Sequence, residues 1–348
     1  MQRKAVSLRK LYEAEIDKNA QLISTNDHEI RDELTTARGD ELETATETIN
    51  DFNEFVAPSR LKGLEHFVDE TDHVKHYDTG AQMPFNKKIF EPLKFPRHLS
   101  IYILDKNNFS SFPQPKKDAL KLFSYYLMDI SSILPPLLLN AKPIDIVLDL
   151  CSAPGGKAMN IIQSMSYKSI VCNDFSRSDR LKHVFGTYFT DLHKLNVNIT
   201  AHNAEEWVEP NAYTKVLVDV PCTNDRESTV REENNMFSHA KLRERILLPE
   251  RQINMLCSGL KAVQVGGAVV YSTCSLSPVQ NDGVVHMALS KIANETSMEF
   301  VINDLSAWIE PWKCLFSFHD NMRHGQLILP YLPLNCGPTY FCRLERRK

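Results

Sequence analysis

Two cysteines stand at the ends of two separate apolar segments, each inside a short polar motif. Cys222 closes the string Asp219-Val220-Pro221-Cys222, and Cys274 lies in Ser272-Thr273-Cys274-Ser275. One thiol after a buried strand is usually structural. Two thiols at equivalent strand ends of a parallel sheet can instead face one cleft. A disulfide is the competing interpretation.

Such a pair suits nucleophilic chemistry on a pyrimidine ring. Carbon 5 of cytosine is too weak a nucleophile to attack a methyl sulfonium, but it becomes enamine-like once a thiolate adds to carbon 6. An acid near ring N3 must stabilise the resulting intermediate, and Asp219 is placed to supply or hold that proton. The carbon-5 proton then leaves, the nucleophile is eliminated, and a second thiol beside the first can help that release.

The remaining thiols do not suggest a metal site or a disulfide framework. The chain has eight cysteines and no C-x-x-C pair, and several cysteines lie in apolar runs. This usage is typical of a reducing compartment, and we expect no metal ligand set.

A glycine-rich motif follows another apolar run. Adjacent glycines let a ligand approach the backbone, and a helix that starts there favours polar ligand groups. A P-loop is excluded because Cys151 and Ala158 stand where it needs Gly and Ser or Thr, and no G-x-G-x-x-G dinucleotide fingerprint is present. The candidate cofactor residues of this motif are Cys151, Ser152, Ala153, Pro154, Gly155, Gly156 and Lys157.

Two further polar residues follow the next apolar runs. The carboxylate of Asp174 could accept hydrogen bonds from both ribose hydroxyls of a nucleoside, or it could cap the following helix. The side-chain amide of Asn203 could hold an adenine amino group, although a surface turn is the stronger explanation of this residue taken alone. Together with Asp219, these residues complete the predicted cofactor site.

Short apolar runs that alternate with helical stretches must position these motifs. Continuous apolar strands predict a parallel sheet covered on both faces, so we expect an α/β, Rossmann-like fold with a mostly parallel seven-stranded sheet. We also expect a helix within Asp118–Leu134. The predicted strands are Ile144–Leu150, Ser169–Phe175, Val197–Ala201, Lys215–Val220, Ala268–Thr273, Gln326–Leu329 and Thr339–Leu344.

Three zones divide the chain. Residues 1–75 are polar and predict a helical acidic extension, whose basic first twelve residues could be a targeting remnant. Residues 76–115 are rich in Pro and Phe and predict a loop-dominated bridge with one strand at Ser100–Leu104. Residues 116–348 form the predicted catalytic domain.

Charge and hydropathy restrict the partners. The net charge of −4 gives no global signal for nucleic acid, so RNA contacts must come from local basic patches. No apolar run is long enough to span a bilayer, and we expect no membrane association. The candidate RNA contacts are Lys87, Lys88, Lys116, Lys117, Lys121, Arg343, Arg346, Arg347 and Lys348.

The strings LDLCSAPGGK, NDFS, VLVDVPCT and VVYSTCSLS resemble those of the Sun-domain (NOL/NOP/Sun) RNA 5-methylcytosine methyltransferases over roughly residues 76–348. The resemblance implies a class I methyltransferase fold that binds S-adenosylmethionine. It makes Cys274 the nucleophile and Cys222 the residue that assists product release. Swapped roles are the internal alternative, as in the DNA enzymes. Asn203 departs from the family's usual Asp but keeps an acceptor.

Longer strings, among them VPCTNDRESTVREENNMF and GPTYFCRLERR, resemble the mitochondrial ribosomal RNA subgroup of that family. This implies small-subunit ribosomal RNA as substrate, the mitochondrial matrix as location, and a helical-repeat partner similar to transcription-termination factors. Two alternatives stay open. They are a mitochondrial transfer-RNA methyltransferase and a ribosome-assembly RNA-binding factor in which catalysis is secondary.

Overall fold

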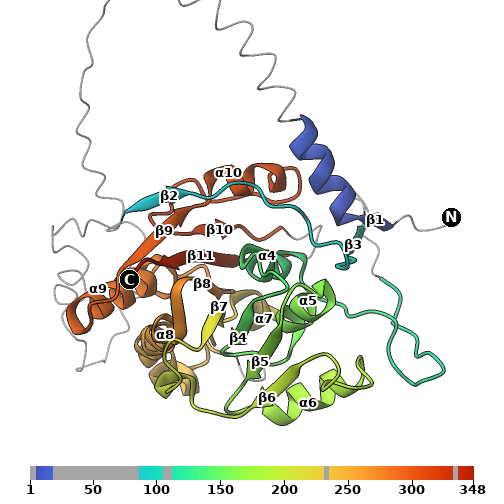
Figure 1. Ribbon diagram of the computed structural model, residues 1–348, viewed down its shortest axis with the longest axis horizontal. Coiled ribbons are helices and arrows are strands. Elements are labelled where there is room, and N and C mark those ends of the chain that lie inside the picture. Colours follow the sequence, from blue (N-terminus) through green and yellow to red (C-terminus); the bar gives the residue numbers. More distant parts are fainter. Residues whose placement is uncertain (1–4, 19–85, 105–111, 231–234, 332–335) are drawn as a thin grey trace, which may run out of the picture. The chain divides into compact units, whose positions relative to one another are not determined.

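The computed structural model describes residues 5–18, 86–104, 112–230, 235–331 and 336–348 (Figure 1). The boundary expected near residue 75 and most of the predicted extension lie outside these ranges. The division into three zones therefore stays a prediction. No helix among the described residues is long and apolar enough to cross a membrane.

A nine-stranded sheet organises the described residues, in the order β2-β9-β11-β8-β7-β4-β5-β6, with β10 paired to β11. A separate two-stranded sheet joins β1 and β3. The strands are β1 (Ala5–Ser7), β2 (Lys87–Ile89), β3 (Tyr102–Leu104), β4 (Ile146–Asp149), β5 (Ser169–Asn173), β6 (Val197–Thr200), β7 (Tyr213–Asp219), β8 (Val263–Thr273), β9 (Phe300–Asp304), β10 (Gln326–Ile328) and β11 (Thr339–Arg346).

The predicted fold class is confirmed, with one change in the strands. Strands β4 to β8 run parallel, and β11 enters antiparallel between β8 and β9. Seven of the strands, from β9 to β6, form the continuous core of the sheet. Strand β9 was not predicted from the sequence, and it belongs to these seven strands in place of the predicted strand at Gln326–Leu329. The predicted strand at Gln326–Leu329 exists as β10, but it pairs only with β11.

Helices cover both faces of the sheet, as the alternating strand side chains show. In β4, Val147 belongs to one buried cluster and Leu148 to the other. The first cluster takes in residues of α4, α5 and α6, and the second takes in residues of α8 and α9. The α-helices are α4 (Leu134–Leu138), α5 (Gly156–Ser164), α6 (Ser178–Gly186), α7 (Asp225–Val230), α8 (Leu242–Ala262), α9 (Val284–Glu295) and α10 (Ser306–Ile309).

The described residues also contain five short turns of other helix types. Four are 3-10 turns, and Val279–Gly283 forms a π-helical turn before α9. The 3-10 turns are η1 (Ile130–Ile133), η2 (Ala204–Glu206), η3 (His239–Lys241) and η5 (Glu310–Trp312).

The predicted helix within Asp118–Leu134 is wrong for most of its length. Helical structure starts only with η1 at Ile130, and the preceding residues form a turn. The Asp118 carboxylate accepts hydrogen bonds from the backbone N–H groups of Leu120 and Leu122, both at 2.9 Å. Asp side chains that bond to nearby backbone donors compete with helix formation. The helical spacing of the apolar residues therefore does not mark a buried helical face, since Leu120 and Leu127 are exposed and only Ile133 and Leu134 belong to the core.

The first described segment packs on the first buried cluster. Residues 8–18 are helical (blue in Figure 1), and Leu8 and Tyr12 are buried in the first cluster. The Tyr12 ring stacks on Trp312 with centroids 4.5 Å apart. The Arg9 guanidinium donates to the Leu99 carbonyl at 3.1 Å. Part of the predicted basic remnant thus contributes to the core, while a targeting role stays a prediction.

Candidate functional site

The two thiols predicted to meet do so. Strands β7 and β8 are parallel neighbours with Asp219 opposite Ser272, so the loops that follow them emerge side by side. The sulfur atoms of Cys222 and Cys274 lie 3.1 Å apart, and neither forms a disulfide. The Cys274 thiol also lies 3.4 Å from the side-chain oxygen of Asn224.

Hydrogen bonding makes the two thiols unequal. A hydrogen bond from Cys274 lowers the pKa of the Cys222 thiol, although burial opposes this. The backbone N–H of Cys274, 3.3 Å away, also donates to the Cys222 sulfur. The same thiol–thiol bond, together with burial, raises the pKa of Cys274, and the Lys157 ammonium opposes that rise. The pair can therefore lose one proton readily and holds the second firmly.

Asp219 stands next to the pair in a defined set of hydrogen bonds. Its Oδ2 lies 2.8 Å from Lys157 Nζ, and its Oδ1 accepts from Ser272 Oγ at 2.7 Å. Burial lowers the pKa of Lys157, but the charge of Asp219 and their hydrogen bond outweigh it and leave that pKa raised. Lys157 and Asp219 thus form an ion pair beside the two thiols, and the Lys157 ammonium in it carries protons.

The glycine motif forms the turn from β4 into α5. Gly155 precedes the helix with φ of +111°, a conformation that side-chain-bearing residues rarely adopt. A Cβ at Gly155 would also lie 2.6 Å from the Phe185 ring. Lys157, in the first turn of α5, carries its ammonium to Asp219. The motif therefore joins the predicted cofactor site to the thiols.

The other residues of the motif are held by β5. The backbone N–H of Ser152 donates to the Asn173 carbonyl at 2.7 Å, and Ala153 N–H donates to Asp174 Oδ2 at 3.1 Å. Pro154 is exposed. The Cys151 thiol is buried 3.8 Å from the sulfur of Met255, so its side chain serves the core.

Asp174 and Asn203 both accept local backbone hydrogen bonds: Asp174 in the turn before α6, whose N-cap is Arg177 and not Asp174 as the structural interpretation predicted, and Asn203 as the N-cap of η2. Asp174 Oδ1 accepts from Arg177 N–H at 2.8 Å, and Asn203 Oδ1 accepts from Glu205 N–H at 3.1 Å. Asn173 connects them, because its Oδ1 accepts from the backbone N–H of His202 at 2.8 Å. A local bond of this kind uses only one acceptor position of each oxygen, so ligand binding remains compatible with it.

Asp149, the last residue of β4, was not predicted as a site residue. Its side chain is buried, and Ser152 Oγ donates to its Oδ2 at 2.9 Å, whereas its buried Oδ1 has no protein partner. Burial, together with the charge of Asp219, raises its pKa to about 7. The unpaired oxygen marks a place where a ligand donor fits.

Three carboxylates therefore surround the glycine turn. Asp149, Asp174 and Asp219 all act electrostatically on the Cys151 thiol, whose pKa they raise in addition to the effect of burial. Two cations face this group, the Lys157 ammonium and the Arg177 guanidinium, the latter 3.5 Å from Asp174 Oδ2. An excess of negative charge here favours a ligand that carries positive charge.

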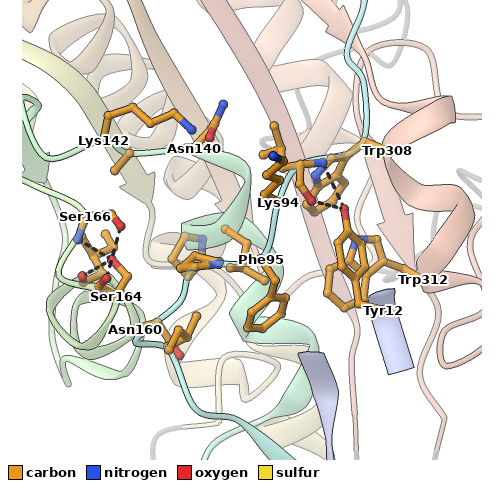
Figure 2. A pocket seen from close by; sticks show the side chains of 17 residues that line it. Tyr12, Lys94, Phe95, Asn140, Lys142, Asn160, Ser164, Ser166, Trp308 and Trp312 are labelled. Carbon is orange, nitrogen blue, oxygen red and sulfur yellow. Dashed lines mark hydrogen bonds between the residues drawn. The ribbon is translucent and has the colours of Figure 1, made fainter. Parts of the chain in front are cut away.

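A separate cavity of about 200 Å³ lies away from these residues. Tyr12, Trp308 and Trp312 gather on one side of it, and Ser164 and Ser166 lie on the other (Figure 2). None of the predicted site residues lines it. The candidate site is thus the edge of the sheet where β4, β5, β7 and β8 end.

Two of the predicted RNA contacts are wrong, because they are buried. Arg343 lies over the Phe90 ring at 4.3 Å and is 5% exposed. Arg346, 6% exposed, donates to the Val263 carbonyl at 2.6 Å. Both side chains serve the packing of β11. Lys116, Lys117 and Lys121 are exposed and remain candidates, as do Lys87, Lys88, Arg347 and Lys348.

Comparison with known proteins agrees with this geometry. Residues 136–310, about half of the chain, match the family model of the 16S rRNA methyltransferase RsmB/F. The chain is 42% identical over 254 residues to the 5-cytosine rRNA methyltransferase NSUN4 of Xenopus tropicalis, an alignment that covers 71% of this chain and 63% of that protein. It is 36% identical over 229 residues to the mitochondrial tRNA (cytosine(34)-C(5))-methyltransferase of Danio rerio, covering 65% of this chain and 61% of that protein.

Among solved structures, NSun6 from Pyrococcus horikoshii shares the fold with a TM-score of 0.52 and 22% identity, covering 69% of this chain and 57% of that chain. The chain spans less than two thirds of the length of the Xenopus and Danio relatives. The match to the family model and the level of identity nevertheless establish the family. The chain belongs to the RsmB/F family of RNA methyltransferases.

Proposed function

We propose that this protein transfers a methyl group from S-adenosylmethionine to carbon 5 of cytosine in RNA, with ribosomal RNA as its substrate. The observation that carries the proposal is the pair of thiols 3.1 Å apart, beside the ion pair of Lys157 and Asp219. A methyltransferase that acts on an oxygen or an amine would need no such pair.

The residues around the glycine turn fit S-adenosylmethionine. This cofactor carries a sulfonium, an ammonium and one carboxylate, so its net positive charge complements the three aspartates. The unpaired Oδ1 of Asp149 can accept a hydrogen bond from the ammonium, and Asp174 has acceptor positions left for the ribose. Asn203 would contact the adenine. When bound, the cofactor supplies an electrophilic methyl group.

The thiol pair accounts for activation of the base. Loss of one proton leaves a single thiolate, and proton transfer across 3.1 Å can place that thiolate on Cys274. The Cys274 sulfur then bonds to carbon 6 of cytosine, and the electron pair of the C5–C6 double bond moves toward N3. Asp219, with the Lys157 ammonium as its proton source, protonates or hydrogen-bonds N3.

When carbon 5 takes the methyl group, the sulfonium that held it leaves as a neutral thioether. Carbon 5 must then lose its proton to water or another base. The electron pair of the C5–H bond re-forms the double bond, and the Cys274 sulfur leaves carbon 6. In this scheme Cys222 assists the release, because its sulfur lies within hydrogen-bond distance of Cys274. The target cytosine has to leave its stack to reach these groups, so a single-stranded or distorted RNA site is expected.

The relatives support ribosomal RNA over transfer RNA. Identity to the ribosomal RNA enzyme of Xenopus is 42%, against 36% to the transfer-RNA enzyme of Danio. The Danio relative is mitochondrial by name, and we propose the mitochondrial matrix for this chain as well. A helical-repeat partner that adds RNA affinity is part of the proposal, since the net charge of −4 offers little attraction for RNA.

The test uses the purified full chain with labelled S-adenosylmethionine. Small-subunit mitochondrial ribosomal RNA and mitochondrial transfer RNA are supplied in separate reactions, and the methylated position is mapped. We expect 5-methylcytosine in the ribosomal RNA. Label found only in transfer RNA would show that the substrate is transfer RNA and not ribosomal RNA. Methylation of an atom other than carbon 5 of cytosine would contradict the proposed reaction.

A further inference from the structure

The residues that follow the two thiols are bonded to each other. Thr223 comes after Cys222 and Ser275 comes after Cys274, and their hydroxyl oxygens lie 2.7 Å apart. Both side chains are buried. The two thiol-bearing loops are therefore joined by side chains as well as by strand pairing.

Asp225, the first residue of α7, is the centre of this junction. Its Oδ1 accepts from Thr223 Oγ1, and its Oδ2 accepts from the backbone N–H of Leu276 at 2.7 Å. Ser275 Oγ lies 3.3 Å from Oδ1, and the Asp225 backbone N–H donates to the Cys274 carbonyl at 3.2 Å. One residue thus bonds to both loops.

The carboxylate also fixes the direction of the hydrogen bonds. An ionised carboxylate only accepts, so Thr223 donates its single hydroxyl proton to Asp225. The 2.7 Å contact then requires Ser275 to donate to Thr223, and the Ser275 oxygen accepts from Ser277 N–H at 3.1 Å. In an Asp225→Asn variant, the side-chain NH2 group would face Thr223 or Leu276, which are themselves donors. The directions of the hydrogen bonds among Asp225, Thr223 and Ser275 would then be lost.

Two buried glutamines support the Cys222 loop from its other side. Gln280 Nε2 donates to Thr223 Oγ1 at 3.1 Å, and its Oε1 accepts from Thr223 N–H at 3.2 Å. Gln252 Nε2 donates to the Pro221 carbonyl at 2.8 Å. These bonds hold the backbone on both sides of Cys222, so the distance between the sulfurs depends on Asp225 holding the opposite loop.

We propose that Asp225 is a positioning residue for the reaction, which keeps the two thiols at hydrogen-bond distance so that they share one proton. The inference rests on the proposed function. The Asp225 carboxylate accepts hydrogen bonds from Thr223 and Leu276 and from neither sulfur, and Ser275 is joined to it through Thr223, so its effect passes through the loops.

The test compares Asp225→Asn with Asp179→Asn, a matched change at an exposed carboxylate of α6. The first readout is the rate of iodoacetamide alkylation of Cys222 and Cys274 as a function of pH, measured without RNA or cofactor. We expect Asp225→Asn to slow alkylation of Cys222, the thiol with the lowered pKa, at pH 7 by about tenfold or more, because separation of the loops would remove the hydrogen bond that Cys222 accepts from the Cys274 thiol. Asp179→Asn should match wild type.

The second readout is kinetic. Asp225→Asn should lower kcat by a similar factor and leave the KM for S-adenosylmethionine unchanged, because the glycine turn is untouched. A folded Asp225→Asn protein with a wild-type alkylation profile would overturn the inference, even if its activity were lower. Where Asp225→Asn does not fold, Thr223→Val removes one bond to the carboxylate at nearly constant volume, and an unchanged profile there overturns it equally.

Failure of the proposed function has a different signature. If wild type methylates no RNA but the alkylation profiles differ as described, the thiol pair is positioned by Asp225 and the reaction assignment is at fault. If wild type methylates RNA and the profiles coincide, the reaction stands and the positioning role is wrong.

Discussion

Removing the Cys274 thiol should make Cys222 less acidic. In the structure the Cys222 sulfur lies 3.1 Å from the Cys274 sulfur and 3.3 Å from the Cys274 backbone N–H. The substitution Cys274→Ala keeps the N–H donor and removes the thiol donor. Burial, which raises the pKa of Cys222, is then opposed by one donor fewer.

The size of the effect follows from the lost bond. A hydrogen bond to a charged acceptor contributes about 1.5–3 kcal/mol, and 1.36 kcal/mol corresponds to one pKa unit. The pKa of Cys222 should therefore rise by roughly 1–2 units. Below that pKa the thiolate fraction, and with it the rate of alkylation, should fall by about 10- to 100-fold.

The assay is alkylation by iodoacetamide across a range of pH, with the Cys222 peptide quantified by mass spectrometry. Cys314→Ala serves as the control, because Cys314 is a partly exposed thiol outside the site. Its removal should leave the Cys222 profile unchanged. A Cys222 profile that is the same in Cys274→Ala and in wild type would refute the reasoning, since the two thiols would then not share a proton.

Three further predictions concern stability and the cofactor site. Asp149→Asn should remove a pH dependence of the free energy of unfolding. Folding raises the pKa of Asp149 from 3.8 to about 7, so wild type should lose stability relative to the variant as pH rises through this range. A difference in unfolding free energy between the two proteins that is the same at all pH values, measured by urea unfolding, would contradict this. Gly155→Ala should lower the free energy of unfolding by about 1–3 kcal/mol, because φ is +111° and the new Cβ meets Phe185. Calorimetric titration should also show weaker binding of S-adenosylmethionine. Unchanged stability and unchanged binding would contradict this prediction. Leu8→Ala should lower the free energy of unfolding by about 2–5 kcal/mol, because Leu8 is fully buried, and a loss below about 1 kcal/mol in urea unfolding would show that the N-terminal segment does not pack as described.

The strands that carry chemistry could be predicted because their signals are local. Continuous apolar runs ending in Asp149, Asp174 and Asp219 predict buried parallel strands whose carboxyl ends meet, and β4, β5 and β7 follow those runs closely. The adjacency of β7 and β8 then brings the loops of Cys222 and Cys274 side by side.

Other features depend on tertiary contacts that the local sequence does not reveal. Strand β9 (Phe300–Asp304) has too short an apolar run to stand out, and pairing with β11 on one side and β2 on the other defines it. Arg343 looks like a surface charge in a basic tail, yet it lies buried over Phe90 in the sheet. Sequence polarity predicts exposure only when no partner in the fold covers the charge.

The residues that hold the thiol-bearing loops could also not be predicted from the local sequence. Asn224, Asp225 and Gln280 were not predicted as site residues, because each is an ordinary polar residue outside the motifs. Their proximity to the cysteines in sequence, two to six residues away, was the one available signal. Their hydrogen bonds across the two loops appear only once β7 and β8 are placed side by side.

The division of labour between the two thiols is the central claim, and trapping the covalent intermediate tests it most directly. Wild type, Cys222→Ala and Cys274→Ala are incubated with S-adenosylmethionine and labelled small-subunit ribosomal RNA, then separated on a denaturing gel. We predict a stable protein–RNA adduct with Cys222→Ala alone, since Cys274 can attack carbon 6 but release is impaired. An adduct with Cys274→Ala and none with Cys222→Ala would contradict the account and assign the nucleophile to Cys222.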